Sequence, residues 1–263
     1  MPIYQHAPIE EALCEFTFAP TAPTEQWDMT LPGRIMYHPN LKDIYVGPSR
    51  QQTVQQVVSD MMGGPNAPTN IAVSSTLLRV LIPTADQKAV LGIGPYTLSI
   101  SSMRPYEGWD NAFKARIHQA LNAYRDVAKP TMVNRIILKY INRLVAPMPG
   151  TIQAAKYLRD INPTIEAKYE NADPFTATLS SYHVRKEFTT TDHTKIYVTQ
   201  ATLQPADPVN TSEFLLDIEV VWDHSSISDF TRALAIVDQL HAIEGAIFEA
   251  VITDEARNLF NAA

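Results

Sequence analysis

The chain has 263 residues, 45% of them hydrophobic, which is enough to fill a substantial core in one large domain or two small ones. Its formal net charge of −7 gives no long-range attraction to phosphate or to anionic lipid, so nucleic-acid binding would require a local basic patch. The single cysteine excludes an internal disulfide, and no apolar stretch approaches the roughly 18 residues of a membrane span. We therefore expect a soluble, cytoplasmic protein that does not associate with a membrane.

The first predicted element is a strand between Pro8 and Pro20, because apolar and polar side chains alternate there. A short, broken helix is expected at 24–37, where a Pro-Gly pair interrupts the helical spacing. Three further strands are then expected, at 43–58, 76–83 and 88–102. A long amphipathic helix at 109–128 ends the first half, since its apolar side chains recur at helical spacing.

The same order of elements recurs in the second half of the chain. It comprises a strand at 132–146, a helix at 151–160, strands at about 175–190, 194–203 and 213–222, and a long helix from about 226 to 252. Ser225 or Ser226 is expected to cap the last helix. The order predicts two β-α-β-β-β-α repeats, at residues 1–130 and 131–263, packed as one compact unit.

The predicted fold class is therefore α+β with an internal duplication. Two such halves can pair their sheets edge to edge, which leaves no strand edge exposed at the junction. The result would be one curved antiparallel sheet with the two long helices on one face. This architecture is similar to the TATA-binding-protein fold and to the helix-grip folds, a similarity that does not imply a function.

No residue spacing in the sequence is typical of a catalytic, metal or cofactor site. Gly92 and Gly94 lie within a predicted strand and precede a proline rather than a helix, which favours close backbone packing over phosphate binding. The seven histidines include no i, i+4 pair on one helix and no cysteine partner, so no zinc site is expected. Asp217 and Glu219 share a strand face, where they could bind a cation or lie solvated opposite basic residues. We predict no catalytic residue, no metal and no cofactor.

The strand at 132–146 carries the candidate binding residues. Because side chains alternate along a strand, Arg135, Lys139 and Arg143 share one face, while Tyr140 and Asn142 share the other. The three cations could form a basic stripe for an anion, an acidic peptide or a nucleic-acid backbone. The alternative is a solvated face whose cations pair with acidic residues of neighbouring strands.

Three segments together resemble a known family. They are Pro8–Phe16 (PIEEALCEF), Arg104–Trp109 (RPYEGW) and Arg135–Arg143 (RIILKYINR). These look like the P-I-x-E-A-x-x-E-F, P-Y-x-G-W and R-Y-I-N-R motifs of a family of uncharacterised, sporadically distributed prokaryotic proteins of about this length. Lys139 stands where that family has arginine, which keeps the charge but weakens a bidentate contact with an anion.

The resemblance implies a prokaryotic cytosolic setting and leaves the activity unknown. A patchy distribution is usual for accessory genes, including those of anti-phage defence and mobile-element cargo. The motif residues also have physical interpretations of their own. Tyr106 and Trp109 at a helix start would staple the helix to the sheet, and Gly108 would permit the turn before it.

Acidic residues of the first strand complete the candidate site. Glu11 and Glu15 share one face of that strand, as Arg135 and Arg143 share one face of the strand at 132–146. If the two strands are neighbours, ion pairs across them follow. The polar cluster is then either a binding site or a clasp that joins the two halves.

Three hypotheses for the function remain open at this point. The leading one is a non-enzymatic binding or accessory protein, self-associating, that engages a protein partner through its sheet face or its loops. The second is a small-ligand or nucleotide binder, or an enzyme, whose pocket between sheet and helices is lined by Arg135, Arg143, Tyr140 and Glu15. The third is a nucleic-acid binder on the sheet face, which the acidic net charge disfavours.

Overall fold

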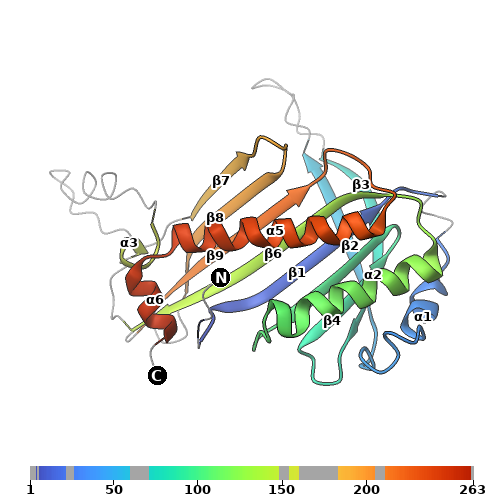
Figure 1. The fold of residues 1–263 in the computed structure, drawn as a ribbon, viewed down its shortest axis with the longest axis horizontal. Helices are drawn as coiled ribbons and strands as arrows, with labels where there is room; N and C mark the ends of the chain where they lie inside the picture. The colour runs from blue at the N-terminus through green and yellow to red at the C-terminus, as the bar shows by residue number, and fades with distance from the viewer. Residues whose placement is uncertain are drawn as a thin grey trace.

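The computed structural model describes residues 4, 6–21, 27–59, 71–147, 154–159, 183–204 and 211–261. These residues form one nine-stranded antiparallel sheet in the order β2-β3-β4-β5-β1-β6-β9-β8-β7 (Figure 1). The strands are β1 (Ile9–Phe18), β2 (Arg50–Ser59), β3 (Ile71–Pro83), β4 (Ala89–Gly94), β5 (Thr97–Met103), β6 (Val133–Ala146), β7 (His183–Thr189), β8 (Lys195–Leu203) and β9 (Ser212–Trp222). The helices are α1 (Leu31–Met36), α2 (Lys114–Ala128), α3 (Ala154–Tyr157), α5 (Phe230–Val251) and α6 (Asp254–Asn261), and a π-helical turn at Trp109–Phe113 precedes α2.

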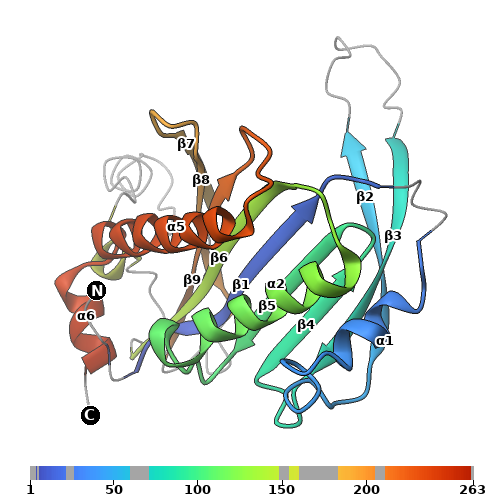
Figure 2. The ribbon, with the colours of Figure 1, turned by 45° about the vertical axis from the view of Figure 1, so that its right-hand side comes forward.

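The two long helices cover one face of the sheet. In Figures 1 and 2, α2 crosses the half that contains β4 and β5, while α5 crosses β6 and β9. The mixed α+β class and the antiparallel sheet predicted from the sequence are thereby confirmed. Among the described residues, no helix is long and apolar enough to cross a membrane.

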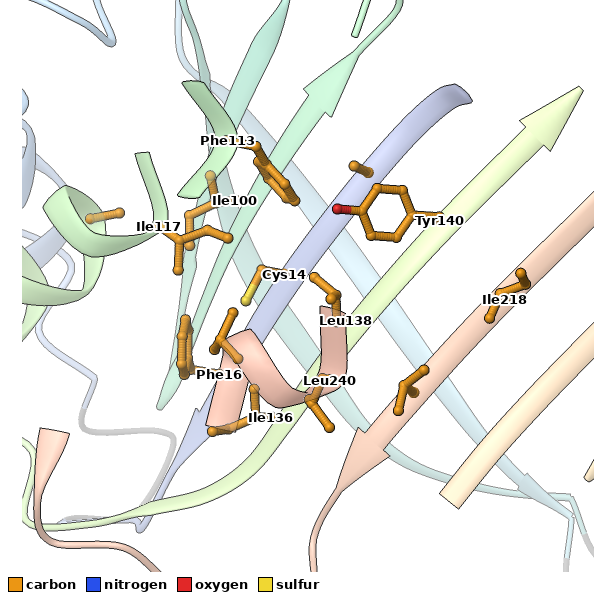
Figure 3. Packing of buried hydrophobic residues seen from close by; sticks show 14 of the residues in the cluster. Cys14, Phe16, Ile100, Phe113, Ile117, Ile136, Leu138, Tyr140, Ile218 and Leu240 are labelled. Atoms are coloured by element: carbon orange, nitrogen blue, oxygen red, sulfur yellow. The ribbon is translucent and has the colours of Figure 1, made fainter. Parts of the chain in front are cut away.

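The core lies between the sheet and these helices. Cys14 and Phe16 of β1 are fully buried there, and Figure 3 shows them beside Ile136 and Leu138 of β6. The Phe18 ring stacks on Tyr124 of α2, with 4.4 Å between ring centroids and 10° between planes. Burial raises the pKa of the Cys14 thiol, so this side chain acts as a small apolar core residue.

The predicted strand at 88–102 is wrong as a single element. The chain reverses at Pro95 and Tyr96, so β4 and β5 form a hairpin in which Gly94 pairs with Thr97. Tyr96 adopts a φ of 56°, in the left-handed region, which the alternating pattern of side chains does not reveal. The first half therefore has four strands between its helices, whereas the second half has three.

Several predicted element boundaries also differ. In the described part of the helix predicted at 24–37, Leu31–Met36 forms α1, and residues 24–26 lie outside the described residues. Pro32 lies in the first turn of α1 and does not interrupt it, because a proline fits that position. Residues 43–49, expected in a strand, precede β2 as turns and loop. Of the helix predicted at 151–160, Ala154–Tyr157 forms α3, while residues 151–153 and 160 lie outside the described residues. Residues 175–182 of the next predicted strand also lie outside them.

The N-cap of α5 is Asp229, and neither of the two predicted serines occupies that position. The Asp229 carboxylate accepts a hydrogen bond of 2.8 Å from the Thr231 N–H, which satisfies one of the free donors at the helix start. Ser226 instead donates from its Oγ to Asn134 Oδ1 over 2.9 Å. The helix consequently begins at Phe230, four residues later than predicted.

Replacing this cap should weaken the fold measurably. We expect Asp229→Ala to lower the free energy of unfolding by about 1 kcal/mol, since one N–H at the start of α5 loses its acceptor. Urea unfolding followed by circular dichroism measures the change. Ser228→Ala, at an exposed neighbouring position, is the control and should leave the unfolding midpoint unaltered; equal effects of the two variants would contradict the assignment.

Candidate functional site

The three segments that carry the family resemblance meet at one end of the central strand pair. The Arg143 N–H of β6 donates to the Pro8 carbonyl over 2.8 Å, and the Arg104 N–H after β5 donates to the Glu10 carbonyl over 2.9 Å. The Arg104 guanidinium also forms an ion pair of 2.7 Å with the Glu10 carboxylate. The start of β1 is thus held from both sides by the other two segments.

A pocket of about 400 Å³ opens at this meeting point. Its walls come from the N-terminal segment, the turn after β5, the end of β6 and α6, and the His6 N–H donates to the Phe260 carbonyl across it over 2.9 Å. The polar lining residues are His6, Arg104, Tyr106 and Arg143. Tyr4 and Phe260, whose rings meet edge to face at 5.4 Å, contribute apolar wall.

The two arginines of the pocket are held differently. Arg143 donates from Nε and Nη2 to Glu213 of β9, over 2.7 Å and 2.5 Å, and the Glu213 side chain is only 3% exposed. The Arg104 side chain, by contrast, is 63% exposed and binds Glu10 at the rim. A guanidinium has five N–H donors, so each arginine retains donors for a further acceptor. The pocket therefore combines the guanidinium of Arg143, which Glu213 holds in place, with the more exposed guanidinium of Arg104.

Tyr106 connects the pocket to a polar layer beneath the helices. Its hydroxyl lies 3.2 Å from the Tyr140 hydroxyl, which lies 3.3 Å from Nδ1 of His241 on α5. The Trp109 ring stacks on His241 at 4.0 Å. Gly108 precedes this turn with a φ of 97°, a conformation that side chains with a Cβ rarely adopt. In Figure 3 the Tyr140 ring points from β6 towards the start of α2.

The polar layer also contains an uncompensated carboxyl group. Glu244 of α5 is 5% exposed and has no hydrogen bond or ion pair with any described residue. Burial raises its pKa to about 8 and lowers the pKa of His241 to about 4. Both groups are therefore uncharged near neutral pH, which explains how they are tolerated between α5 and the sheet.

The other predicted cations and acids lie on the opposite face of the sheet. The predicted ion pairs between β1 and β6 do not form, although the two strands are neighbours. The register places Glu11 opposite Ile141 and Glu15 opposite Ile137, so the carboxylates alternate with the cations instead of facing them.

Glu15 and Lys139 form ion pairs with other strands instead. Glu15 binds Arg79 of β3 over 2.9 Å, and Lys139 binds Asp217 of β9 over 2.8 Å. Nε of Arg135 is buried and finds no hydrogen-bond acceptor in the described part of the chain. This face is thus a band of ion pairs between strands, which is the second of the two interpretations of the basic stripe.

Gly92 makes the Arg79 contact possible. A Cβ at this position would lie 2.2 Å from Ser99 Oγ and 3.2 Å from Cδ of Arg79. Because Gly92 has no side chain, Arg79 can extend over β4 and β5 to reach Glu15 on β1. The predicted close packing around this glycine therefore involves side chains from both neighbouring strands.

The sequence interpretation missed four residues: His6 and Arg104 of the pocket, Arg79 of the band of ion pairs, and Glu244 of the polar layer. Two of them had a usable signal. Arg104 begins the second segment of the resemblance, and Glu244 lies three residues after His241 and therefore on the apolar stripe of the helix. The partner of Glu15 depends on a strand order that periodicity does not specify.

Comparison with protein-family models gives no match for this chain, and comparison with curated proteins gives none either. In the described ranges, no three histidine, cysteine, aspartate or glutamate side chains come together as a metal site would require. The geometry of the pocket and of the polar layer therefore carries the functional argument.

Glu244 should make stability depend on pH. Its folded pKa of about 8 lies above the ordinary value of 4.5, so between these pH values the folded chain keeps a proton that the unfolded chain has lost. The free energy of unfolding must then fall as pH rises through this window. We expect Glu244→Gln to be more stable than wild type by roughly 2 to 4 kcal/mol above pH 8, and about equal to it near pH 4.5.

Urea unfolding of both proteins at several pH values measures this difference. His241, whose folded pKa is lowered, contributes a loss of stability as pH falls through its own window, and that contribution cancels in the difference. Glu255→Gln, at an exposed carboxyl on α6, is the matched control. A Glu244→Gln difference that stays constant between pH 5 and pH 8 would be incompatible with a buried neutral carboxyl.

Proposed function

We propose that this chain is a binding protein that holds the anionic group of a small organic ligand in the pocket at the end of β1 and β6. One observation carries the proposal: the three segments of the family resemblance each contribute to this pocket. Pro8 comes from the first, Arg104 and Tyr106 from the second, and Arg143 from the third.

The lining suits such a ligand chemically. Arginine donors and the His6 ring favour a carboxylate or a phosphate, because charge-assisted hydrogen bonds are the strong ones. The rings of Tyr4, Tyr106 and Phe260 offer contact area for an apolar or aromatic body. The volume of about 400 Å³ falls within the range typical of small-molecule sites.

The remaining predicted site residues support the pocket or lie away from it. Tyr140 holds the Tyr106 hydroxyl, and Asn142 fastens β6 to β9 by donating to the Leu216 carbonyl over 3.1 Å. The four other charged residues lie on the sheet face without the long helices: Glu11, Glu15, Arg135 and Lys139. In this proposal the ligand binds at the end of the strand pair rather than between the sheet and the helices.

We further propose that residues 1–130 and 131–263 are duplicated units in the manner of the TATA-binding-protein fold. Support comes from the central pair, since β1 and β6 begin the two halves and run antiparallel beside each other. In each half the chain passes from the central strand to the outer edge of the sheet and returns strand by strand towards the centre, and a long helix on the same face follows (Figure 2). The extra strand of the β4–β5 hairpin would be an insertion in the first unit.

Engagement of a protein partner is the second candidate function. Of the described large apolar residues that are exposed, Met29 and Tyr37 lie close to either end of α1 in the chain, where they could bind an apolar surface. Membership of a prokaryotic accessory system, such as anti-phage defence, remains a prediction that rests on the resemblance.

Native mass spectrometry of gently purified protein tests the ligand proposal. We expect a discrete small-molecule adduct whose affinity Arg104→Gln lowers by at least about tenfold, since one charge-assisted hydrogen bond contributes roughly 1.5 to 3 kcal/mol. Arg34→Gln is the matched control, because Arg34 is also an exposed arginine paired with a carboxylate but lies outside the pocket. Equal adduct in both variants, or none in wild type, argues against the pocket, and a co-purifying protein chain would favour the second candidate.

A further inference from the structure

Strand β7 forms one edge of the sheet. It is the last strand of the sheet, and nothing among the described residues pairs with its outer side (Figures 1 and 2). Every side chain from His183 to Thr189 is exposed except that of Lys186, and the apolar Val184 and Phe188 are 39% and 49% exposed. Edge strands of this kind are templates for pairing with another chain.

The backbone groups at this edge can be assigned from the β7–β8 hairpin. The Thr190 N–H donates to the Thr194 carbonyl over 2.9 Å, so the peptide groups of Thr190 point towards β8. Because alternate residues of an antiparallel strand point their N–H and C=O groups to opposite sides, those of Arg185 and Glu187 point outward. The outer edge therefore offers donors and acceptors at these odd-numbered residues that no described strand pairs with.

We propose that β7 pairs antiparallel with β7 of a second copy of this chain, about a two-fold axis at Lys186. The two nine-stranded sheets would then join into one. Opposed residues in an antiparallel pair share a face. A two-fold axis perpendicular to the sheet must therefore pass midway between one residue and the same residue of the second copy. The choice of this central residue sets the register of the pair.

Side-chain complementarity selects Lys186 as the central residue. This register places Arg185 opposite Glu187 of the second copy, which forms two ion pairs on one face. It also places Val184 opposite Phe188 of the second copy, which forms two apolar pairs on the other face. Centring on Arg185 or on Glu187 would instead oppose two like charges at a hydrogen-bonded position and leave Val184 and Phe188 unmatched.

Two further features bear on this interface. The Arg185 guanidinium lies over the Tyr197 ring, 4.9 Å from its centroid, which already positions it on the face where Glu187 of the second copy would lie. Lys186 would face its own copy, and like charges in direct opposition are unfavourable. Lys186 already interacts within its own chain, however, and its long side chain can bend away from the axis.

Cysteine cross-linking tests the register. The natural Cys14 is buried, so a cysteine introduced on β7 provides the accessible thiol. In the proposed dimer Lys186 occupies a non-hydrogen-bonded pair, with Cα atoms about 4.5 Å apart, which suits a disulfide. We expect Lys186→Cys to form a covalent dimer under mild oxidation, while Arg185→Cys and Glu187→Cys each stay monomeric. Equal cross-linking of all three variants, or none at Lys186, would overturn the register.

Charge exchange tests the pairing without a covalent bond. Sedimentation over a range of concentrations should show a monomer–dimer equilibrium for the full chain, weakened at least about tenfold by Arg185→Glu. The double variant Arg185→Glu/Glu187→Arg should restore it, which also controls for folding. A monomer at all concentrations, or an Arg185→Glu dimer of unchanged strength, would rule out the proposal, and binding only to another protein would assign the edge to a different partner. None of these three results tests the ligand pocket.

Discussion

The antiparallel pairing of β1 with β6 is the constraint on which the rest of this structure depends. It joins two segments that are far apart in the sequence. Every other strand of the sheet lies on one side or the other of this pair. Most of its helix-facing side chains, such as Cys14, Phe16 and Leu138, are apolar and fully buried, so the pairing is held by a continuous core as well as by its backbone ladder. The register of this one pair then decides where each charged side chain of the centre points.

The two faces of the sheet differ in the side chains that they carry. Beneath the helices the described core is mostly apolar, but it includes a polar layer in which Tyr140, His241 and the uncharged Glu244 lie between β6 and α5. Such a layer lowers stability relative to an apolar core, and groups of this kind are often retained because they specify one arrangement or serve a function. The opposite face carries ion pairs such as Glu15–Arg79 and Lys139–Asp217, which tie neighbouring and more distant strands together.

The candidate pocket lies where the central pair ends and its two strands diverge from regular pairing. Backbone hydrogen bonds from Arg104 and Arg143 fix the start of β1 there, so the polar groups that line the pocket are mounted on a rigid frame. α6 closes the remaining side, since the His6 N–H is bound to the Phe260 carbonyl. The position therefore combines a firm scaffold with access from solvent, as binding sites at the ends of strands commonly do.

The sequence by itself determined the α+β class, the central strands and the two long helices, because periods of 2 and 3.6 residues are local properties of the chain. It also showed that Arg135, Lys139 and Arg143 share one face. Only the tertiary structure decided that Glu15 binds Arg79 and that Arg143 binds Glu213. These contacts depend on strand order and register between distant segments, and on the absence of a side chain at Gly92. The pocket was equally beyond the sequence, since its walls come from four separate parts of the chain that only folding brings together.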